Sequence, residues 1–543
     1  MQATPTVGLM TTGDLPRPTA GADHRRAVLD MLELHAQQHP LNPALSVLER
    51  GRWRRLSYLA LAQRVRELAA WLVRRLPEGG QSVAVLGESN PAWGVVALGT
   101  VASGNVLVPL DPGAGRGALA DMLGMVRPAL LFVSARHADL AREVANGICD
   151  LVIIEDPLLE AVLPEPDAGA ARSAGGIEPA PDTALMVFTS GTTGTPKLVE
   201  IGFDNLHFQI RSLTRSFALR PSDRLLSMLP LHHMLELTAG FLCPLWRGAQ
   251  IHYLGSLLPG EALAEMRALG ITRVVTVPAW LALLARELRH RAPDRGAARD
   301  AFGPDFEHFV CGGAALPAAL ERYFSDLGAP VMQGYGLTET APVIATNTLG
   351  ERRDGSVGRP LPGTEVRVEA SGEILIRGPQ VASRYHLGAD ERADVADDER
   401  WFHTGDLGHL DAQGFLHVTG RAKSTIVLAN GKNVQPEEIE ACLDECDELA
   451  ESGVVGLSGE RAGESVCAVV VPAESFRSRP GAAGGDPARG VRRVIDQALA
   501  PLAAYKRPRR VLVSDTPLPR TTTGKLCRPA LRALAERLAE DAS

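Results

Sequence analysis

The chain has 543 residues, of which 45% are apolar and 22% are charged, and its formal net charge is −8. This length exceeds what a single hydrophobic core usually serves, so at least two domains are expected. The composition is that of a globular protein rather than a disordered one. The acidic balance gives no basic footprint for nucleic acid and no polybasic stripe for anionic lipid.

The first 22 residues are expected to form a flexible tail, because they have neither a basic start nor the apolar stretch of a signal peptide. No apolar run approaches the length needed to cross a bilayer. The seven cysteines form no Cys-x-x-Cys pair, and no further ligand near Cys442 and Cys446 completes a zinc site. These features predict a reduced, cytoplasmic protein.

Helical and strand-like segments alternate from Ser57 onward. One helix face is marked by Leu61, Val65, Leu68 and Leu72. Short apolar runs follow at residues 82–87, 106–110, 130–133 and 151–154, and a second series lies at 225–229, 250–254, 273–277 and 309–311. Alternation of this kind predicts parallel sheets covered by helices.

Residues 164–182 are rich in Ala, Gly, Pro and Asp and are interpreted as an exposed connection. The buried strand predicted at 184–188 then leads into a run of hydroxyl residues and glycines that ends in Lys197. The run is Thr189, Ser190, Gly191, Thr192, Thr193, Gly194, Thr195, Pro196 and Lys197. Its glycines allow several N–H groups to turn toward one anion, which favours a phosphate cradle. Taken alone, it could also be a surface turn, and its spacing is not that of a P-loop kinase.

The pattern changes after Gly355. Alternating stretches at 364–368 and 372–377 predict a smaller antiparallel or barrel-like part. A compact α+β unit is expected beyond Arg421, interrupted by a solvated loop at 475–490. The predicted class is therefore α/β, with a large N-terminal domain of helix-covered, mostly parallel sheets, a small barrel-like part and a small C-terminal α+β domain.

Four further motifs follow the cradle in order. They are Gly334-Tyr335-Gly336-Leu337-Thr338-Glu339-Thr340, Thr404-Gly405-Asp406, Gly420-Arg421-Ala422-Lys423 and Pro519-Arg520-Thr521-Thr522-Thr523-Gly524-Lys525. Together with the cradle they resemble the signature set of the adenylate-forming superfamily, which includes acyl-CoA synthetases, peptide-synthetase adenylation domains and luciferases. The resemblance extends from about Asp30 to about Leu534.

The resemblance implies that a carboxylic acid and ATP react to give an acyl adenylate. Thr189 and Glu339 would help to hold Mg²⁺, which prefers oxygen ligands. Tyr335 would offer a flat face to adenine, and Asp406 would accept both ribose hydroxyls because a carboxylate has two acceptor oxygens. Arg421 would contact the ribose or the α-phosphate. The remaining nucleotide-binding residues would be Ser190, Gly191, Thr192, Thr193, Gly194, Lys197, Gly334, Gly336 and Thr338.

Lys525 would bridge the acid and the α-phosphate and stabilise the charge of the transition state. The family joins the acyl group to a thiol after rotating its C-terminal domain, and Lys423 matches the hinge of that rotation. Gly431 and Lys432 would then border the thiol tunnel. We therefore expect an N-terminal domain over residues 23–420 and a mobile C-terminal domain over 421–543.

The acid is less well specified by the sequence. His233 matches the family residue that lines the acyl pocket, and the pocket wall would include Gly312, Gly313 and Ala314. Glu236 could replace the aspartate that amino-acid-activating relatives carry, although an exposed helix glutamate is the expected alternative. Arg384 precedes Tyr385, and Arg400 precedes Trp401, where glycine is common in the family; none of these four residues is assigned to chemistry.

The small apolar wall favours an alkyl chain. The residues of the motifs most resemble those of medium- to long-chain fatty acyl-CoA synthetases. The predicted enzyme uses ATP, Mg²⁺ and coenzyme A, and needs no nucleic acid. One alternative is transfer of the acyl group to an acyl carrier protein. The other is a nucleotide-binding scaffold without turnover, against which the intact motif residues argue.

Overall fold

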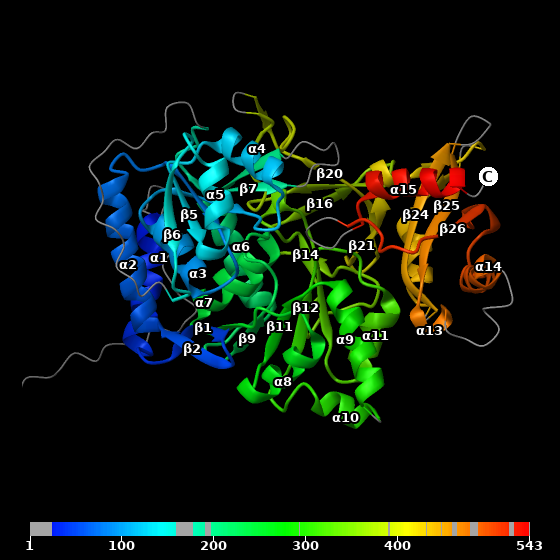
Figure 1. The fold of residues 1–543 in the computed structure, drawn as a ribbon, viewed down its shortest axis with the longest axis horizontal. Helices are drawn as coiled ribbons and strands as arrows, with labels where there is room; N and C mark the ends of the chain where they lie inside the picture. The colour runs from blue at the N-terminus through cyan, green and yellow to red at the C-terminus, as the bar shows by residue number, and fades with distance from the viewer. Residues whose placement is uncertain are drawn as a thin grey trace, which may run out of the picture.

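The computed structural model describes residues 24–158, 177–189, 197–292, 294–388, 391–430, 432–446, 448–458, 464–477, 487–520 and 526–541. It has a large N-terminal domain with mostly parallel sheets and a smaller C-terminal domain, which confirms the predicted α/β class (Figure 1). Within the ranges just given, no helix is long and apolar enough to cross a membrane.

The N-terminal domain contains two large sheets. The first, as far as it is described, has nine strands: β15 (Arg359–Pro360), β14 (Ala345–Thr346), β13 (Val331–Tyr335), β12 (His308–Cys311), β11 (Arg273–Thr276), β9 (Arg224–Ser227), β10 (Gln250–Tyr253), β1 (Pro43–Glu49) and β2 (Arg52–Ser57). The second, over the same described ranges, has eight: β19 (Arg392–Asp394), β18 (Arg384–His386), β8 (Lys197–Gly202), β7 (Thr183–Thr189), β4 (Val106–Leu110), β3 (Ser82–Leu86), β5 (Leu130–Ser134) and β6 (Asp150–Ile154). The central strands of both sheets are parallel and the edges include antiparallel pairs.

Helices lie between the sheets and on both outer faces. The inner layer packs into one core with residues of both sheets and contains α1 (His24–Gln38), α2 (Tyr58–Arg75), α3 (Pro91–Ala102), α6 (Phe203–Ser216), α7 (Cys243–Arg247) and the π-helix η2 (Glu236–Leu242). The first sheet is covered outside by α8 (Pro259–Leu269), α9 (Pro278–Arg291), α10 (Arg295–Asp300) and α11 (Ala318–Asp326), and the second by α4 (Arg116–Val126) and α5 (Ala138–Val144).

The sequence explains the two central helices. Ser57 caps α2 by accepting a hydrogen bond from the Ala60 amide at 3.3 Å, and the apolar residues predicted to share one face are all buried. Helix α3 begins with an Asn90 cap followed by Pro91, and its residues from Pro91 to Thr100 are buried on every side. A Cβ on Gly94 of this helix would lie 2.9 Å from the Phe241 ring of η2, so the inner layer is tightly packed.

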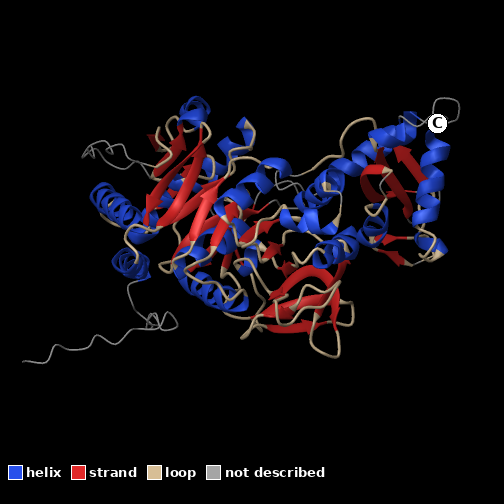
Figure 2. Ribbon diagram, turned by 90° about the horizontal axis from the view of Figure 1, so that it is seen from below, coloured by secondary structure: helices blue, strands red, loops and turns tan. Residues whose placement is uncertain are grey.

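A four-stranded antiparallel sheet forms the small part after Gly355. It comprises β16 (Glu365–Val368), β17 (Glu373–Arg377), β20 (Phe402–Leu410) and β21 (Leu416–Arg421) in that order. The last two strands lead to the C-terminal domain, which lies at one end of the molecule in Figure 1 and has its own sheet flanked by helices in Figure 2.

The C-terminal domain has its own apolar core around the sheet β24-β25-β26. Its elements are η4 (Ala422–Ser424), β22 (Ile426–Val427), β23 (Asn433–Val434), α12 (Pro436–Leu443), β24 (Leu449–Ser458), β25 (Glu464–Pro472), α13 (Glu474–Arg477), α14 (Pro487–Ala498), η6 (Ala504–Lys506), β26 (Arg510–Val513) and α15 (Arg528–Asp541). The loop predicted at 475–490 is corrected at its two ends, where α13 reaches Arg477 and α14 begins at Pro487; residues 478–486 lie outside the described residues. Val491 and Ile495 of α14, just after the predicted loop, are fully buried at a helical spacing and anchor this helix in the core.

Candidate active site

The site begins where β13 ends and the neighbouring antiparallel sheet approaches it. Tyr335, the last residue of β13, is half-buried, and its hydroxyl donates a 2.7 Å hydrogen bond to Oδ2 of Asp406 in β20. Asp406 is only 3% exposed. Two residues that lie 71 positions apart in the sequence thus meet directly, as the predicted nucleotide site requires.

Arg421 completes this group because β20 and β21 pair with Asp406 opposite Arg421. The Arg421 Nε lies 2.7 Å from Oδ1 of Asp406. The Thr404 hydroxyl donates to the Ile374 carbonyl and accepts from the Asp406 amide, which fixes the backbone beneath the carboxylate. Each carboxylate oxygen retains a second lone pair, so the carboxylate can still accept from two vicinal hydroxyls.

Tyr335 keeps its proton in this environment. Burial, followed by the negative charge of Asp406, raises the pKa of Tyr335 well above its ordinary value. The phenol is therefore a permanent hydrogen-bond donor to the carboxylate. The residue after Tyr335 must be small, because a Cβ on Gly336 would lie 1.9 Å from the Pro342 carbonyl oxygen. No side chain fits without moving the loop that carries Tyr335.

Glu339 belongs to the single turn η3 (Thr338–Thr340), which also holds Thr338. The Ala382 amide donates to the Glu339 carbonyl at 2.8 Å, and the Tyr385 hydroxyl donates to Oε1 of its carboxylate at 2.9 Å. Tyr385 was not assigned a role from the sequence. No local pattern indicates its contact with Glu339, because the contact joins β18 to a loop 46 residues away.

The two ends of the predicted phosphate cradle are paired. Thr189, at the end of β7, lies opposite Lys197 at the start of β8. The Lys197 ammonium lies 5.2 Å from the centroid of the Tyr385 ring. Tyr385 therefore touches both Lys197 and Glu339, which connects the cradle to the predicted metal-binding carboxylate.

The donor set fits Mg²⁺. This ion usually takes one or two protein oxygens and fills its remaining positions with water and substrate phosphate. Thr189 would supply a hydroxyl and Glu339 a carboxylate. The described part of the chain has no cluster of three or more His, Cys, Asp or Glu side chains that would suit a metal held by protein ligands alone.

Several predicted residues are not tested by this geometry. Ser190, Gly191, Thr192, Thr193, Gly194, Gly431 and Lys525 lie outside the described residues. Lys423 is exposed in the turn η4, directly after β21. Lys432 lies in the C-terminal domain with its ammonium 4.2 Å from the Tyr505 ring centroid. The hinge and thiol-tunnel roles of these residues remain predictions.

The residues predicted to line the acyl pocket come from two separate segments of the chain. Gly312 is buried, and a Cβ on it would lie 3.4 Å from the Gly334 carbonyl and 3.5 Å from the Leu235 side chain. His233 lies two residues before Leu235, with its ring 4.1 Å from that of His232. His232 is buried, and burial lowers its pKa despite Asp111 at 3.5 Å. Gly313 and Ala314 are exposed at the turn that follows.

Glu236 corrects the expectation of an exposed helix residue. Its side chain is fully buried in η2, and the Ser227 hydroxyl donates to Oε1. Within the described structure Oε2 has no hydrogen-bond partner. Burial is the dominant cause that raises the pKa of Glu236 to about 8, so the carboxyl group is largely protonated at neutral pH. An uncharged Glu236 is a poor substitute for the aspartate that pairs with an ammonium group.

Glu236 should therefore make the protein less stable as the pH rises. Between the ordinary pKa near 4.5 and the folded-state pKa of about 8, the folded protein keeps a proton that the unfolded chain loses. This group alone lowers the free energy of unfolding by about 1.4 kcal/mol per pH unit in that window. In urea unfolding at pH 5 to 8, the free energy of unfolding of Glu236→Gln should depend less on pH than that of the wild type. If the free energy of unfolding changed equally with pH in the wild type and the variant, Glu236 would not be a neutral, buried carboxyl group in the folded protein.

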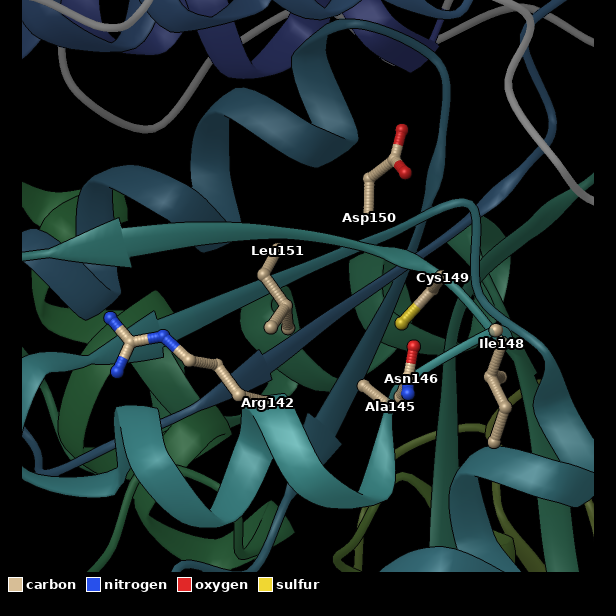
Figure 3. Close-up of a pocket in the computed structure, with 8 residues that line it drawn as sticks. Arg142, Ala145, Asn146, Ile148, Cys149, Asp150 and Leu151 are labelled. Atoms are coloured by element: carbon tan, nitrogen blue, oxygen red, sulfur yellow. The ribbon is translucent and has the colours of Figure 1, made fainter.

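A separate pocket lies away from these residues. It has a volume of about 320 Å³ and is lined by Arg142, Asn146, Cys149 and Asp150 among others, between α5 and β6 (Figure 3). Strand β6 is at the edge of the second sheet, and β4, β3 and β5 separate it from β7. At about 4.8 Å per strand, β6 lies roughly 19 Å from β7, so the pocket is not part of the candidate site.

Two parts of the chain match models of enzyme domains. Residues 32–386 match the family of AMP-binding enzymes, and residues 438–525 match the AMP-binding enzyme C-terminal domain. Indoleacetate–CoA ligase of Aromatoleum aromaticum is 31% identical over 94% of this chain and 98% of its own length. Long-chain-fatty-acid–CoA ligase of Mycobacterium bovis is 27% identical over 81% and 82%. The ATP-bound structure of MatB from Rhodopseudomonas palustris is 27% identical, with a TM-score of 0.76 over 93% of this chain and 98% of that one.

The chain belongs to the AMP-binding enzyme family, which confirms the adenylate-forming resemblance. It is an acid–thiol ligase that uses ATP, Mg²⁺ and coenzyme A and acts through an acyl adenylate. The geometry described above is consistent with this class, since Tyr335, Asp406 and Arg421 converge without any further movement.

Proposed function

We propose that this ligase converts a medium- or long-chain fatty acid into its coenzyme A thioester. The reaction class rests mainly on the Asp406 carboxylate, which meets Tyr335 and Arg421 at 2.7 Å each. The choice of acid rests on the apolar approach of Leu235 to Gly312, which favours a hydrocarbon chain. The residues found in the sequence motifs support the same choice of acid.

In the first half-reaction, a carboxylate oxygen of the acid attacks the α-phosphorus of ATP and pyrophosphate leaves. Tyr335, Asp406 and Arg421 would hold the nucleoside, and Lys197 would reach the β- and γ-phosphates from the base of its hairpin. Thr189 and Glu339 would hold Mg²⁺, which neutralises charge on the phosphate oxygens. Lys525 would stabilise the charge that develops between the acid and the α-phosphate.

In the second half-reaction, the thiol of coenzyme A loses its proton and attacks the acyl carbon, and AMP leaves. We propose that the domain from residue 421 onward rotates about Lys423 before this step. The loop with Gly431 and Lys432 would then face the thiol tunnel. The adjacency of Arg421 and η4 supports this assignment, because the segment proposed as the hinge follows the nucleotide site directly in the chain.

Aromatic acids are the second candidate substrates. The relative that acts on indoleacetate supports this candidate, and the relative that acts on long-chain fatty acids supports the first. A buried, protonated Glu236 argues against amino acids in either case. Both relatives are named as coenzyme A ligases, which favours coenzyme A over a carrier protein as the acceptor.

Pyrophosphate release across a panel of acids tests the proposal. We expect the largest kcat/KM with saturated fatty acids of medium or long chain, compared with indoleacetate, a cinnamate and a set of amino acids. Each acid is measured with coenzyme A, with a phosphopantetheinyl carrier protein and with neither. A clear preference for an aromatic acid would overturn the substrate proposal, and acyl transfer to the carrier protein alone would overturn the acceptor. Silence with every acid would favour a scaffold.

A further inference from the structure

Tyr385 occupies a position that the proposed reaction has not used. It contacts Lys197 and Glu339, the two residues assigned to the triphosphate and to Mg²⁺. We propose that Tyr385 is a positioning residue that orients the Glu339 carboxylate for Mg²⁺ and holds the Lys197 ammonium at the edge of the phosphate site. This inference rests on the proposed roles of Glu339 and Lys197.

The strand that carries Tyr385 is firmly attached. In β18, Tyr385 pairs with Val199 and His386 pairs with Leu198 of β8. His386 forms a hydrogen bond with Glu200, and both side chains are fully buried. The Thr183 hydroxyl donates to the second Glu200 oxygen at 3.1 Å, so this pair joins β18 to β8 and β7. Tyr385 is therefore presented from a rigid base.

The hydroxyl of Tyr385 constrains one oxygen of Glu339. It donates to Oε1 at 2.9 Å, while the backbone of Glu339 is held by Ala382, three residues before Tyr385. A carboxylate with one oxygen held this way has its second oxygen in a defined direction, which suits a metal that tolerates little distortion.

The ring of Tyr385 acts on Lys197. The ammonium lies 5.2 Å from the ring centroid, within the range of a cation–π interaction. A long lysine side chain loses considerable rotational freedom when it binds a ligand. Holding the ammonium on the ring before ATP arrives reduces this loss, and the fixed pairing of Lys197 with Thr189 keeps the lysine at the base of the cradle.

Two substitutions separate these contacts. Tyr385→Phe removes the hydroxyl and keeps the ring, whereas Tyr385→Leu removes both. Binding is measured without turnover, by calorimetry with a non-hydrolysable ATP analogue, with and without Mn²⁺. Free Mn²⁺ is followed in parallel by electron paramagnetic resonance.

Tyr385→Phe should weaken Mn²⁺ binding to the analogue complex about tenfold, the size of one hydrogen bond to a charged group, and should leave metal-free binding of the analogue near that of the wild type. Tyr385→Leu should also weaken metal-free binding, because Lys197 loses its support. Tyr323→Phe is the matched control, since Tyr323 lies beneath Arg289 at 4.8 Å on α11. It should change neither titration.

An unchanged Mn²⁺ titration in Tyr385→Phe would overturn the proposal. So would an equal loss of metal-dependent and metal-free binding, because a general structural role predicts equal losses. Thermal unfolding of each variant shows whether it is folded, and the phenylalanine variant keeps the packed ring. A wild-type protein that binds the analogue with Mn²⁺ but turns over no fatty acid would instead contradict only the proposed substrate.

Discussion

Lys525→Ala should slow acyl-adenylate formation by ~10²–10³-fold, the usual cost of removing one donor that stabilises developing charge. The proposed role of Lys525 is confined to the first half-reaction. The loss should therefore appear in acid-dependent ATP–pyrophosphate exchange, while the affinity for ATP changes little. When synthetic acyl-AMP and coenzyme A are supplied, the variant should form thioester at nearly the wild-type rate.

Lys506→Ala is a suitable control for that experiment. Lys506 is also a lysine of the C-terminal domain, but its ammonium is paired with the Glu438 carboxylate at 2.6 Å and is not assigned to catalysis. It should leave exchange near the wild-type rate. If Lys525→Ala impaired both half-reactions to the same extent, the proposal that Lys525 acts only in the first half-reaction would be wrong.

Asp406→Asn should lower kcat/KM for ATP by roughly 10- to 150-fold. A hydrogen bond to a charged group contributes about 1.5–3 kcal/mol, which corresponds to that range of rates. The substitution replaces an acceptor oxygen with a donor nitrogen opposite Tyr335 and Arg421, which are both donors. Steady-state kinetics with varied ATP and saturating acid measure the effect, which should fall mainly on KM.

Asp411→Asn provides a matched control in the turn that joins the same two strands. Asp411 also pairs with an arginine, Arg353, and accepts from the Phe415 amide, but it follows the end of β20 that lies away from Asp406. It should lower thermal stability without raising KM for ATP. Tyr335→Phe, which removes a single hydroxyl from Asp406, should have a smaller effect than Asp406→Asn, and the reverse order would contradict the geometry.

Patterns that are local in the sequence predicted much of the fold. The apolar face of α2 and the short buried runs of β3, β4 and β5 were read correctly because periodicity and burial agree there. The loop expected at 475–490 was partly wrong. Its composition favours turns, but its last residues, from Pro487, belong to α14, whose buried face at Val491 and Ile495 lies just beyond the predicted loop.

The sequence likewise predicted one part of the candidate site and missed another. Tyr335, Asp406 and Arg421 were found because each lies in a distinctive motif, and the structure brings them together. Tyr385 was missed because its contacts depend on the pairing of β18 with β8, which no local pattern encodes. Glu236 was misplaced because η2 is buried from Glu236 to Phe241, its polar residues included, and no local pattern in the sequence shows that burial.

The tight inner layer bears on how acid preference could be altered by engineering. Phe241 of η2 fills the space beside Gly94, so a larger side chain at either position would press on α3, which is buried on every side. The exposed turn at Gly313 and Ala314 carries no such constraint, because a Cβ on Gly313 would meet only Val277 at 3.8 Å. Its positive φ of 83° limits what Gly313 itself can become. Ala314, which we propose lines the acyl pocket, is exposed, so substitutions there are expected to leave the interior undisturbed.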